Sequence, residues 1–174
     1  MYSPFPIRSA SDLHPMPASE ENPQPKTPTP SALAGKLRAA QAHLTDRQLP
    51  QAQAAFLKLI QLDPQNPAAH LGLAQAHLAQ RHSTEAIDSA HAALALQPSN
   101  PAAHYILGIA LHRIGQVDPA IAALTTCLQH HPHHQPALRR LILISEKRQR
   151  DPQKAAQYKA QLAAAEQNQP TNPT

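Results

Sequence analysis

The sequence predicts an all-α fold built from repeated helical hairpins. Three sets of landmark residues each recur every 34 positions: Pro64, Pro98 and Pro132; Ala52, Ala86 and Ala120; Ala40, Ala74 and Gly108. Hydrophobic residues make up 41% of the chain while aromatic residues make up 3%, so the core must consist of Ala and Leu, which suits closely approaching helices. With 4 Gly against 19 Pro, the chain lacks the glycines that nucleotide-binding loops and turn-rich β sandwiches require.

The domain organisation follows from composition. A chain of 174 residues is long enough for one folded domain with tails. Residues 1–31 are rich in Pro, Ser and Glu and cannot bury enough apolar surface to offset the entropy lost on ordering. We therefore predict a disordered Pro-rich segment over 1–31, a helical domain over 32–167 and a disordered tail over 168–174. We expect neither a signal peptide nor a membrane span, because no apolar run has the required length.

The period divides the domain into copies at 33–66, 67–100 and 101–134. Asn66 with Pro67, and Asn100 with Pro101, are N-cap and first-turn pairs, so each pair begins the first helix of a copy. Within the second copy, a break near residues 81–83 separates two helices. In the third copy the break is at Gly115, and the next helix is expected to start at Asp118.

A degenerate fourth copy covers 135–167. Leu138 and Leu141 keep the apolar positions, but Ile142 replaces the small residue and no final proline closes the unit. Asp151 and Pro152 begin its second helix, whose outer face is expected to carry Ala156, Lys159 and Gln167. A polar outer face suits a hairpin that caps the end of a stack.

The repeat pattern resembles a known family. The third copy displays it best, with His104, Leu107, Gly108, Leu111, Ala120, Leu124 and Pro132. These spacings are similar to those of the tetratricopeptide repeat. The resemblance implies a right-handed α-solenoid of antiparallel helical hairpins, with three repeats and a capping fourth. It also implies a non-catalytic protein-interaction or scaffold module that binds a partner peptide or helix in the concave groove. The alternative is a regulatory or targeting subunit of an enzyme whose catalytic part is a separate chain.

In the resembling family the ligand lies on the first helices of successive repeats. The inward positions implied here are Leu37, Gln41, Leu71, Gln75, Leu78, Tyr105, Ile109, His112, Arg139, Arg140 and Leu143. Residues 135–174 carry seven basic and three acidic side chains, so the last third of this surface is basic and favours a partner with an acidic segment. The alternative, that these arginines are solvated capping charges, stays open. We expect no nucleic acid, since aromatic side chains to stack bases are scarce.

One subfamily of the resembling repeats grips chaperone tails with a clamp of Lys, Asn and Arg side chains. At the clamp positions this chain has Leu37 and Gln41, then Gly72, then Ala102 and Ile106. When the frame is moved by one repeat, only Arg140 fits. The sequence therefore argues against a chaperone-tail clamp.

No enzyme, metal or cofactor site is predicted. His43, His70, His77 and His104 fall at helix positions that the family gives to aromatic residues, so we expect half-buried packing roles for them. The run His130, His131, His133 and His134 is interrupted by Pro132 and offers no defined metal geometry. Cys127, the single cysteine, is expected to be a small buried hydrophobe, and its isolation favours a cytoplasmic protein. Catalytic motifs and paired carboxylates are missing from the sequence.

Overall fold

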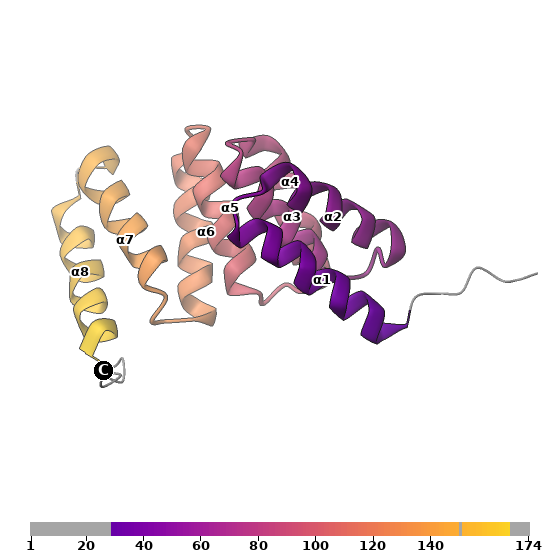
Figure 1. Cartoon of the computed structure of the whole chain (residues 1–174). Helices are drawn as coiled ribbons and strands as arrows, with labels where there is room; N and C mark the ends of the chain where they lie inside the picture. The colour runs from indigo at the N-terminus through magenta and orange to yellow at the C-terminus, as the bar shows by residue number, and fades with distance from the viewer. Residues whose placement is uncertain (1–28, 150, 168–174) are drawn as a thin grey trace, which may run out of the picture.

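The computed structural model describes residues 29–149 and 151–167. The predictions for residues 1–28, 150 and 168–174 lie outside this part of the chain. The described residues form helices and turns only, with no strand. The helices are α1 (Pro30–Thr45), α2 (Leu49–Leu62), α3 (Pro67–Ala79), α4 (Ser83–Leu96), α5 (Pro101–Arg113), α6 (Val117–His130), α7 (Gln135–Ile144), the short π-helix η1 (Ser145–Gln149) and α8 (Pro152–Gln167) (Figure 1).

Helices α3 and α5 start after the N-cap residues predicted from the sequence. The side-chain oxygen of Asn66 accepts a hydrogen bond from the backbone N–H of Ala69 at 3.2 Å, and that of Asn100 accepts from Ala102 and Ala103. These bonds satisfy N–H groups that have no partner within the helix. Two starts differ slightly from the expected positions. α1 begins at Pro30 after Thr29, two residues before the predicted domain start, and α6 begins at Val117 rather than Asp118.

The turns inside the first three hairpins share one backbone conformation. Arg47, Arg81 and Gly115 lie 34 residues apart and have φ angles of 59°, 67° and 86°. This left-handed region ends a helix and is comfortable only for glycine. The first two turns therefore hold arginines in a conformation that side chains disfavour.

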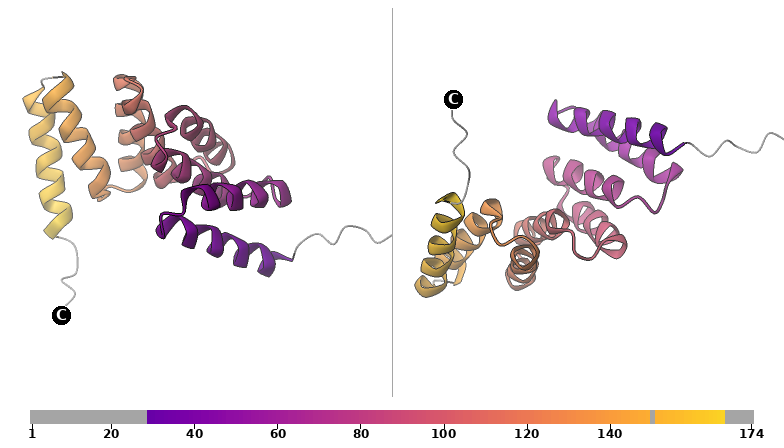
Figure 2. Two further views of the ribbon diagram at one scale, coloured as in Figure 1. Left: turned by 45° about the horizontal axis from the view of Figure 1, so that its top comes forward. Right: turned by 90° about the horizontal axis from the view of Figure 1, so that it is seen from below.

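The hairpins stack in chain order as a right-handed α-solenoid. α1 pairs with α2, α3 with α4, α5 with α6, and α7 with α8, and each second helix also packs against the first helix of the next hairpin. Figure 2 shows the four hairpins following one another along an arc, from α1 at one end to α8 at the other. Because α3 contacts both α1 and α5, the first helices form one continuous layer over these three repeats.

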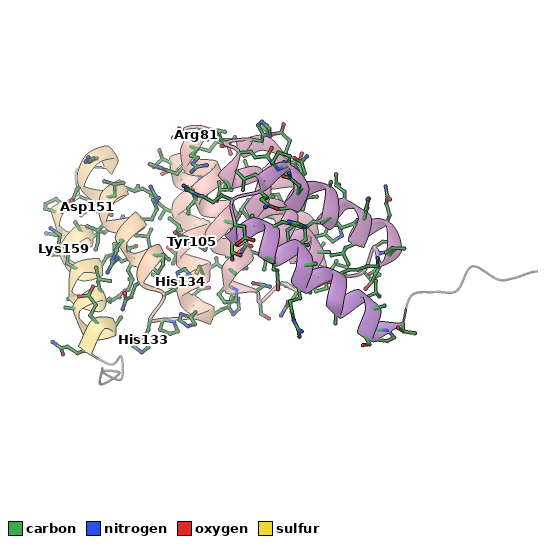
Figure 3. All side chains as sticks on the ribbon, viewed as in Figure 1. Arg81, Tyr105, His133, His134, Asp151 and Lys159 are labelled. Carbon is green, nitrogen blue, oxygen red and sulfur yellow. The ribbon has the colours of Figure 1, made fainter. Side chains whose placement is uncertain are left out.

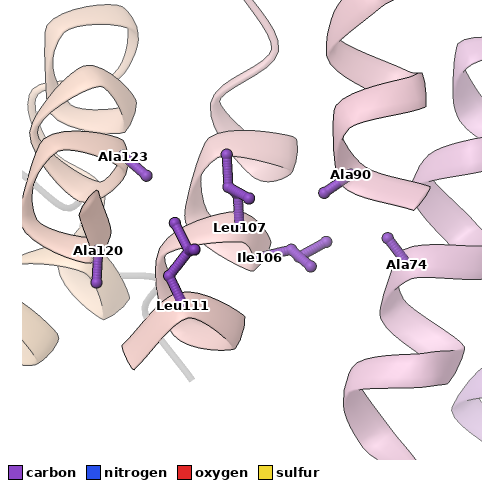
Figure 4. Packing of buried hydrophobic residues seen from close by; sticks show 7 residues of the cluster. All are labelled: Ala74, Ala90, Ile106, Leu107, Leu111, Ala120 and Ala123. Atoms are coloured by element: carbon purple, nitrogen blue, oxygen red, sulfur yellow. The ribbon is translucent and has the colours of Figure 1, made fainter. Parts of the chain in front are cut away.

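The core consists mainly of small and aliphatic residues, as the composition predicts, and the ring of Phe56 in α2 is also fully buried. In the central cluster, Ile106 of α5 points towards Ala90 of α4 and Ala74 of α3, while Leu111 lies near Ala120 (Figure 4). Gly108 allows α5 and α6 to approach, because a Cβ there would lie 2.7 Å from Leu124 Cγ and 3.2 Å from the carbonyl oxygen of Ala120. The predicted small residues Ala40, Ala52, Ala86 and Ala120 are fully buried.

The fourth hairpin has the predicted core and polar outer face. Leu138 and Leu141 are fully buried, whereas Ile142 is half-buried. The carboxylate of Asp151 accepts a hydrogen bond from the backbone N–H of Lys154 at 3.0 Å and so caps α8. Ala156, Lys159 and Gln167 are exposed. None of the described helices is both long and apolar enough to cross a membrane.

Candidate functional site

Three adjoining cavities follow the first helices α3, α5 and α7. The first, of about 280 Å³, lies between α3 and α5 and is lined by Gln75, Leu78, Ala79, Ala102, Tyr105, Ile106 and Arg113. The second, of about 420 Å³, lies between α5 and α7 and is lined by Tyr105, Pro136, Arg139, Arg140 and Leu143. The third, of about 700 Å³, is lined by Leu44, Arg47, Leu49, Gln75, Ala79, Arg81 and Arg113. We call these the apolar trough, the α7 cavity and the turn cavity.

Tyr105 joins the apolar trough to the α7 cavity, since it lines both. Its ring is half-buried and lies against the ring of His134, with the centroids 4.8 Å apart (Figure 3). Burial raises the pKa of the Tyr105 hydroxyl, an effect that the nearby Arg140 charge partly opposes. Tyr105 is therefore a neutral, fixed aromatic wall with a cationic neighbour.

Arg113 joins the apolar trough to the turn cavity. A guanidinium nitrogen of Arg113 donates a hydrogen bond to the backbone carbonyl of Leu78, so α5 holds α3 at this point. Burial lowers the pKa of Arg113, and the positive charges of Arg81 and Arg140 lower it further. The Arg113 charge in α5 is therefore within reach of the charge of Arg81 in a turn and of Arg140 in α7.

Arg139 and Arg140 are adjacent in α7 and were both predicted as groove residues, but their surroundings differ. Arg139 is exposed and forms an ion pair with Glu166 of α8 at 3.1 Å. Arg140 is half-buried and takes part in no ion pair among the described residues. Arg140 is therefore the α7 arginine with a charge available to a ligand.

The predicted groove residues divide into two groups. Gln75, Leu78, Tyr105, Arg139, Arg140 and Leu143 line the cavities. The others line none of the three: Leu37 and Leu71 pack against core clusters, Ile109 is 7% exposed, His112 is half-buried and Gln41 is exposed on α1. The cavities thus bring together residues of α3, α5 and α7, and the predicted residues of α1 lie apart from them.

Of the four histidines expected to be half-buried, His43, His70 and His104 are half-buried, whereas His77 is more deeply buried. His70 and His104 are half-buried, and each donates a ring N–H to a proline carbonyl, of Pro64 at 3.0 Å and of Pro98 at 2.8 Å. His77 is 8% exposed, its Nδ1 has no hydrogen-bond partner, and burial lowers its pKa. In the described part of the chain, no group of three or more His, Cys, Asp or Glu side chains is arranged to hold a metal ion.

Cys127 is the small buried hydrophobe that the sequence predicts. It is fully buried against Leu124, Ala137 and Leu141, and burial raises the pKa of its thiol to about 11. The thiol is therefore protonated and unreactive at neutral pH.

The sequence reasoning missed the turn cavity. From the sequence, Arg47 has no predicted role, residue 81 lies only in the break between two helices, and Arg113 is not among the predicted groove residues. Positions 47 and 81 are 34 residues apart, so the repeat period itself could have placed two arginines at one edge of neighbouring hairpins.

Comparisons with known proteins agree with the fold. The family model described as tetratricopeptide repeat matches residues 37–90 and 73–126, together more than half of the chain. No curated protein sequence matches. Among solved structures, the crystal structure of MamA has a TM-score of 0.71 at 22% identity, covering 80% of this chain and 81% of MamA.

Two further structures are tetratricopeptide repeat domains. The first tetratricopeptide repeat domain of human RPAP3 has a TM-score of 0.60 at 17% identity, covering 79% of this chain and 97% of that domain. The first such domain of Spaghetti (RPAP3), bound to the HSP90 peptide SRMEEVD, has a TM-score of 0.63 at 20% identity, covering 66% and 90%. At these identities the likeness concerns the fold.

Proposed function

The chain belongs to the tetratricopeptide repeat family, and on this premise we propose that it is a non-catalytic interaction module that binds a segment of a partner protein along the concave surface of its first helices. The observation that carries the proposal is the continuity of the three cavities. Gln75, Ala79 and Arg113 line both the turn cavity and the apolar trough, and Tyr105 lines both the trough and the α7 cavity. An extended peptide or a helix can therefore contact all three without leaving the surface.

The chemistry of the cavities supports a protein ligand. The trough offers Leu78, Ile106 and the face of Tyr105 to an apolar side chain, and Gln75 offers an amide for backbone hydrogen bonds. The Spaghetti (RPAP3) domain of the same fold binds a peptide. This chain has other residues at the chaperone-clamp positions, so the proposal is a peptide site of different recognition chemistry.

We also propose that the module acts in the cytoplasm. Its one cysteine, Cys127, is buried and reduced, a usage that suits a reducing compartment. Fractionation of the host cell with an antibody against the chain tests this location, and recovery in an oxidising compartment would contradict it.

Site-specific photo-crosslinking in the host tests the binding surface. A photoreactive phenylalanine derivative replaces Tyr105 in one variant and Leu57, an exposed residue of α2 that lines none of the cavities, in a control. We expect a partner to crosslink from position 105 and not from 57. Crosslinks from 57 alone, or from neither position, would contradict the proposal.

The purified partner then allows the surface to be dissected by titration. Tyr105→Ala and Arg140→Ala should each lower affinity by about tenfold or more, because they remove an aromatic wall and an unpaired charge. Arg139→Ala should have a smaller effect, since Glu166 already neutralises that side chain. The exposed His130 and His131 serve as controls, and a dominant loss at His130→Ala or His131→Ala would move the site elsewhere.

A further inference from the structure

The turn cavity concentrates positive charge from three separate elements. Arg47 comes from the turn between α1 and α2, Arg81 from the turn between α3 and α4, and Arg113 from the end of α5. The remaining lining residues are Leu44, Leu49, Gln75 and Ala79, so no acidic side chain lines the cavity. Figure 3 shows Arg81 at the upper edge of the stacked hairpins.

These arginines are not neutralised within the described part of the chain. The ion pairs there join Arg139 to Glu166, Lys154 to Asp151 and Lys159 to Glu146, all in the fourth hairpin. Arg113 instead lies within electrostatic range of Arg81 and Arg140. Like charges gathered beside an apolar surface repel one another, and a bound anion relieves this repulsion.

The backbone at Arg47 and Arg81 is a second, independent observation. Both residues have positive φ, where a side chain is strained, whereas the matching turn of the third repeat contains Gly115. Glycine would serve the turn better at all three positions. Strain retained at residues that line one cavity points to a role for their side chains there.

We propose that the turn cavity binds the carboxylates of an acidic segment in the partner protein, while an apolar side chain of the same segment enters the adjoining trough beside Tyr105. This inference rests on the proposed function and adds the chemistry of the partner. The guanidinium groups of Arg47, Arg81 and Arg113 can each donate paired hydrogen bonds to a carboxylate. None of them occupies a chaperone-clamp position of the sequence, since those positions hold Leu37, Gln41, Gly72, Ala102 and Ile106.

A protein segment suits the site better than a nucleic acid. Single-stranded nucleic acids are held by several aromatic side chains that stack on successive bases. Tyr105 is the aromatic side chain of the three cavities, and its ring already contacts His134. The trough beyond it is lined by Leu78, Ala79, Ala102 and Ile106, which suit an aliphatic or aromatic side chain of a peptide.

Selection from a display library of random linear peptides against the full chain tests the inference. We expect the enriched peptides to carry Asp or Glu residues close to a Leu, Ile or Phe. Each enriched peptide is then synthesised with a fluorophore, and its binding to the protein is measured by fluorescence anisotropy. A control peptide has every Asp replaced by Asn and every Glu by Gln. The control peptide should bind at least about tenfold more weakly, and raised salt should lower the affinity of the acidic peptide.

Matched variants identify the site. Arg47→Asn with Arg81→Asn removes two charges while keeping a residue type that tolerates positive φ, so the turns are preserved. This double variant should bind the acidic peptide about tenfold more weakly or worse. Lys36→Gln with Lys58→Gln removes the same charge from exposed positions that line none of the three cavities, and should leave the affinity unchanged.

The outcomes separate this inference from the proposed function. If the enriched peptides carry no acidic residues, or bind the Asn variant normally while Tyr105→Ala abolishes binding, the acidic site is wrong and the peptide surface stands. If no peptide is enriched, or binding ignores both the arginines and Tyr105, both proposals fail. A short uridine oligonucleotide that binds with the same arginine dependence, where acidic peptides do not bind, would also overturn the inference.

Discussion

The ring of Phe56 in α2 occupies the space that a side chain at residue 72 in α3 would need. A Cβ built on Gly72 would overlap the Phe56 ring, which is fully buried and cannot move towards solvent. One repeat later, the positions that correspond to Phe56 and Gly72 hold Ala90 and Ile106, which belong to one core cluster. At the first of these interfaces the large side chain, Phe56, comes from the second helix of a hairpin. At the next interface the large side chain, Ile106, comes from the first helix of the following hairpin.

Because one of these two positions must be small when the other is large, substitutions at Phe56 and Gly72 should have non-additive effects on the free energy of unfolding. Phe56→Ala should lower the free energy of unfolding by about 3 to 5 kcal/mol because it leaves a cavity. Gly72→Ile alone should also destabilise, because the ring blocks the new side chain. The double variant copies the Ala90 and Ile106 arrangement and should be more stable than Phe56→Ala by about 1 kcal/mol or more. Chemical denaturation of the four proteins measures the coupling, and additive losses would contradict the pairing.

The repeat period shows why the sequence could place the elements but not this pair. Several features of the sequence act locally, through the backbone or through one close helix contact. They are the regularly spaced prolines, the N-cap residues Asn66 and Asn100, and the small residues Ala74 and Gly108. The Phe56 ring and Gly72 belong to different repeats, and their positions look unrelated until the hairpins are stacked. Packing between repeats depends on the combined size of two facing residues. A period found by comparing single positions therefore does not reveal it.

The same limit applies to the candidate site. The resemblance to the tetratricopeptide repeat family implied the first-helix residues Leu78, Tyr105 and Arg140, and a regular helix then fixes the face on which each side chain lies. Arg47 and Arg81 lie in turns, where the direction of a side chain depends on φ. Their convergence with Arg113 in one cavity therefore had to be seen in the folded chain.

The hairpin turns give a prediction about backbone strain. Arg81→Gly should stabilise the fold by about 0.5 to 1 kcal/mol, because relief of the left-handed strain exceeds the extra entropy that glycine loses on folding. Gly115→Ala should destabilise by a similar amount. No atom lies within 4 Å of a Cβ at residue 115, so φ alone would cause this loss. Thermal unfolding measures both changes, and shifts of the same sign would refute the argument.

His134 gives a prediction about pH. It takes the N-cap position that Asn66 and Asn100 hold in the earlier repeats, and its Nδ1 accepts a hydrogen bond from the backbone N–H of Ala137 at 3.1 Å. Only the neutral ring can accept this bond. Burial, together with the nearby His131, lowers the pKa of His134. The unfolded chain therefore takes up a proton at a higher pH than the folded chain does, and stability falls as the pH drops below the ordinary histidine pKa of about 6.5.

His134→Asn should remove this part of the pH dependence, because an asparagine cap does not titrate. The variant should gain stability over the wild type at pH 5 by up to about 1 kcal/mol and differ less at pH 8. His77, whose pKa is also lowered, should leave a residual acid loss in both proteins. His133→Asn, at an exposed neighbouring position, serves as the control. An equal gain at both pH values would show that the His134 ring does not cap α7 in its neutral form.

Chemical labelling of Cys127 can show whether the fourth hairpin opens separately from the rest of the solenoid. The thiol is fully buried between α6 and α7, against Ala137, Leu141 and Ile144, and its pKa is raised to about 11. A thiol reagent can therefore reach it only when the fourth hairpin opens or the whole domain unfolds. Because each repeat contacts only its neighbours, the fourth hairpin should open without disturbing the first.

Two core variants at opposite ends of the chain distinguish these routes. Leu141→Ala loosens the contact that covers Cys127 and should accelerate labelling at least about tenfold under native conditions, since the cavity costs about 2 to 5 kcal/mol locally. Phe56→Ala removes a comparable contact in α2, which three helices separate from α6, and should leave the labelling rate near that of the wild type. Equal acceleration by both variants would mean that Cys127 is exposed only by global unfolding, so that the four hairpins behave as a single cooperative unit.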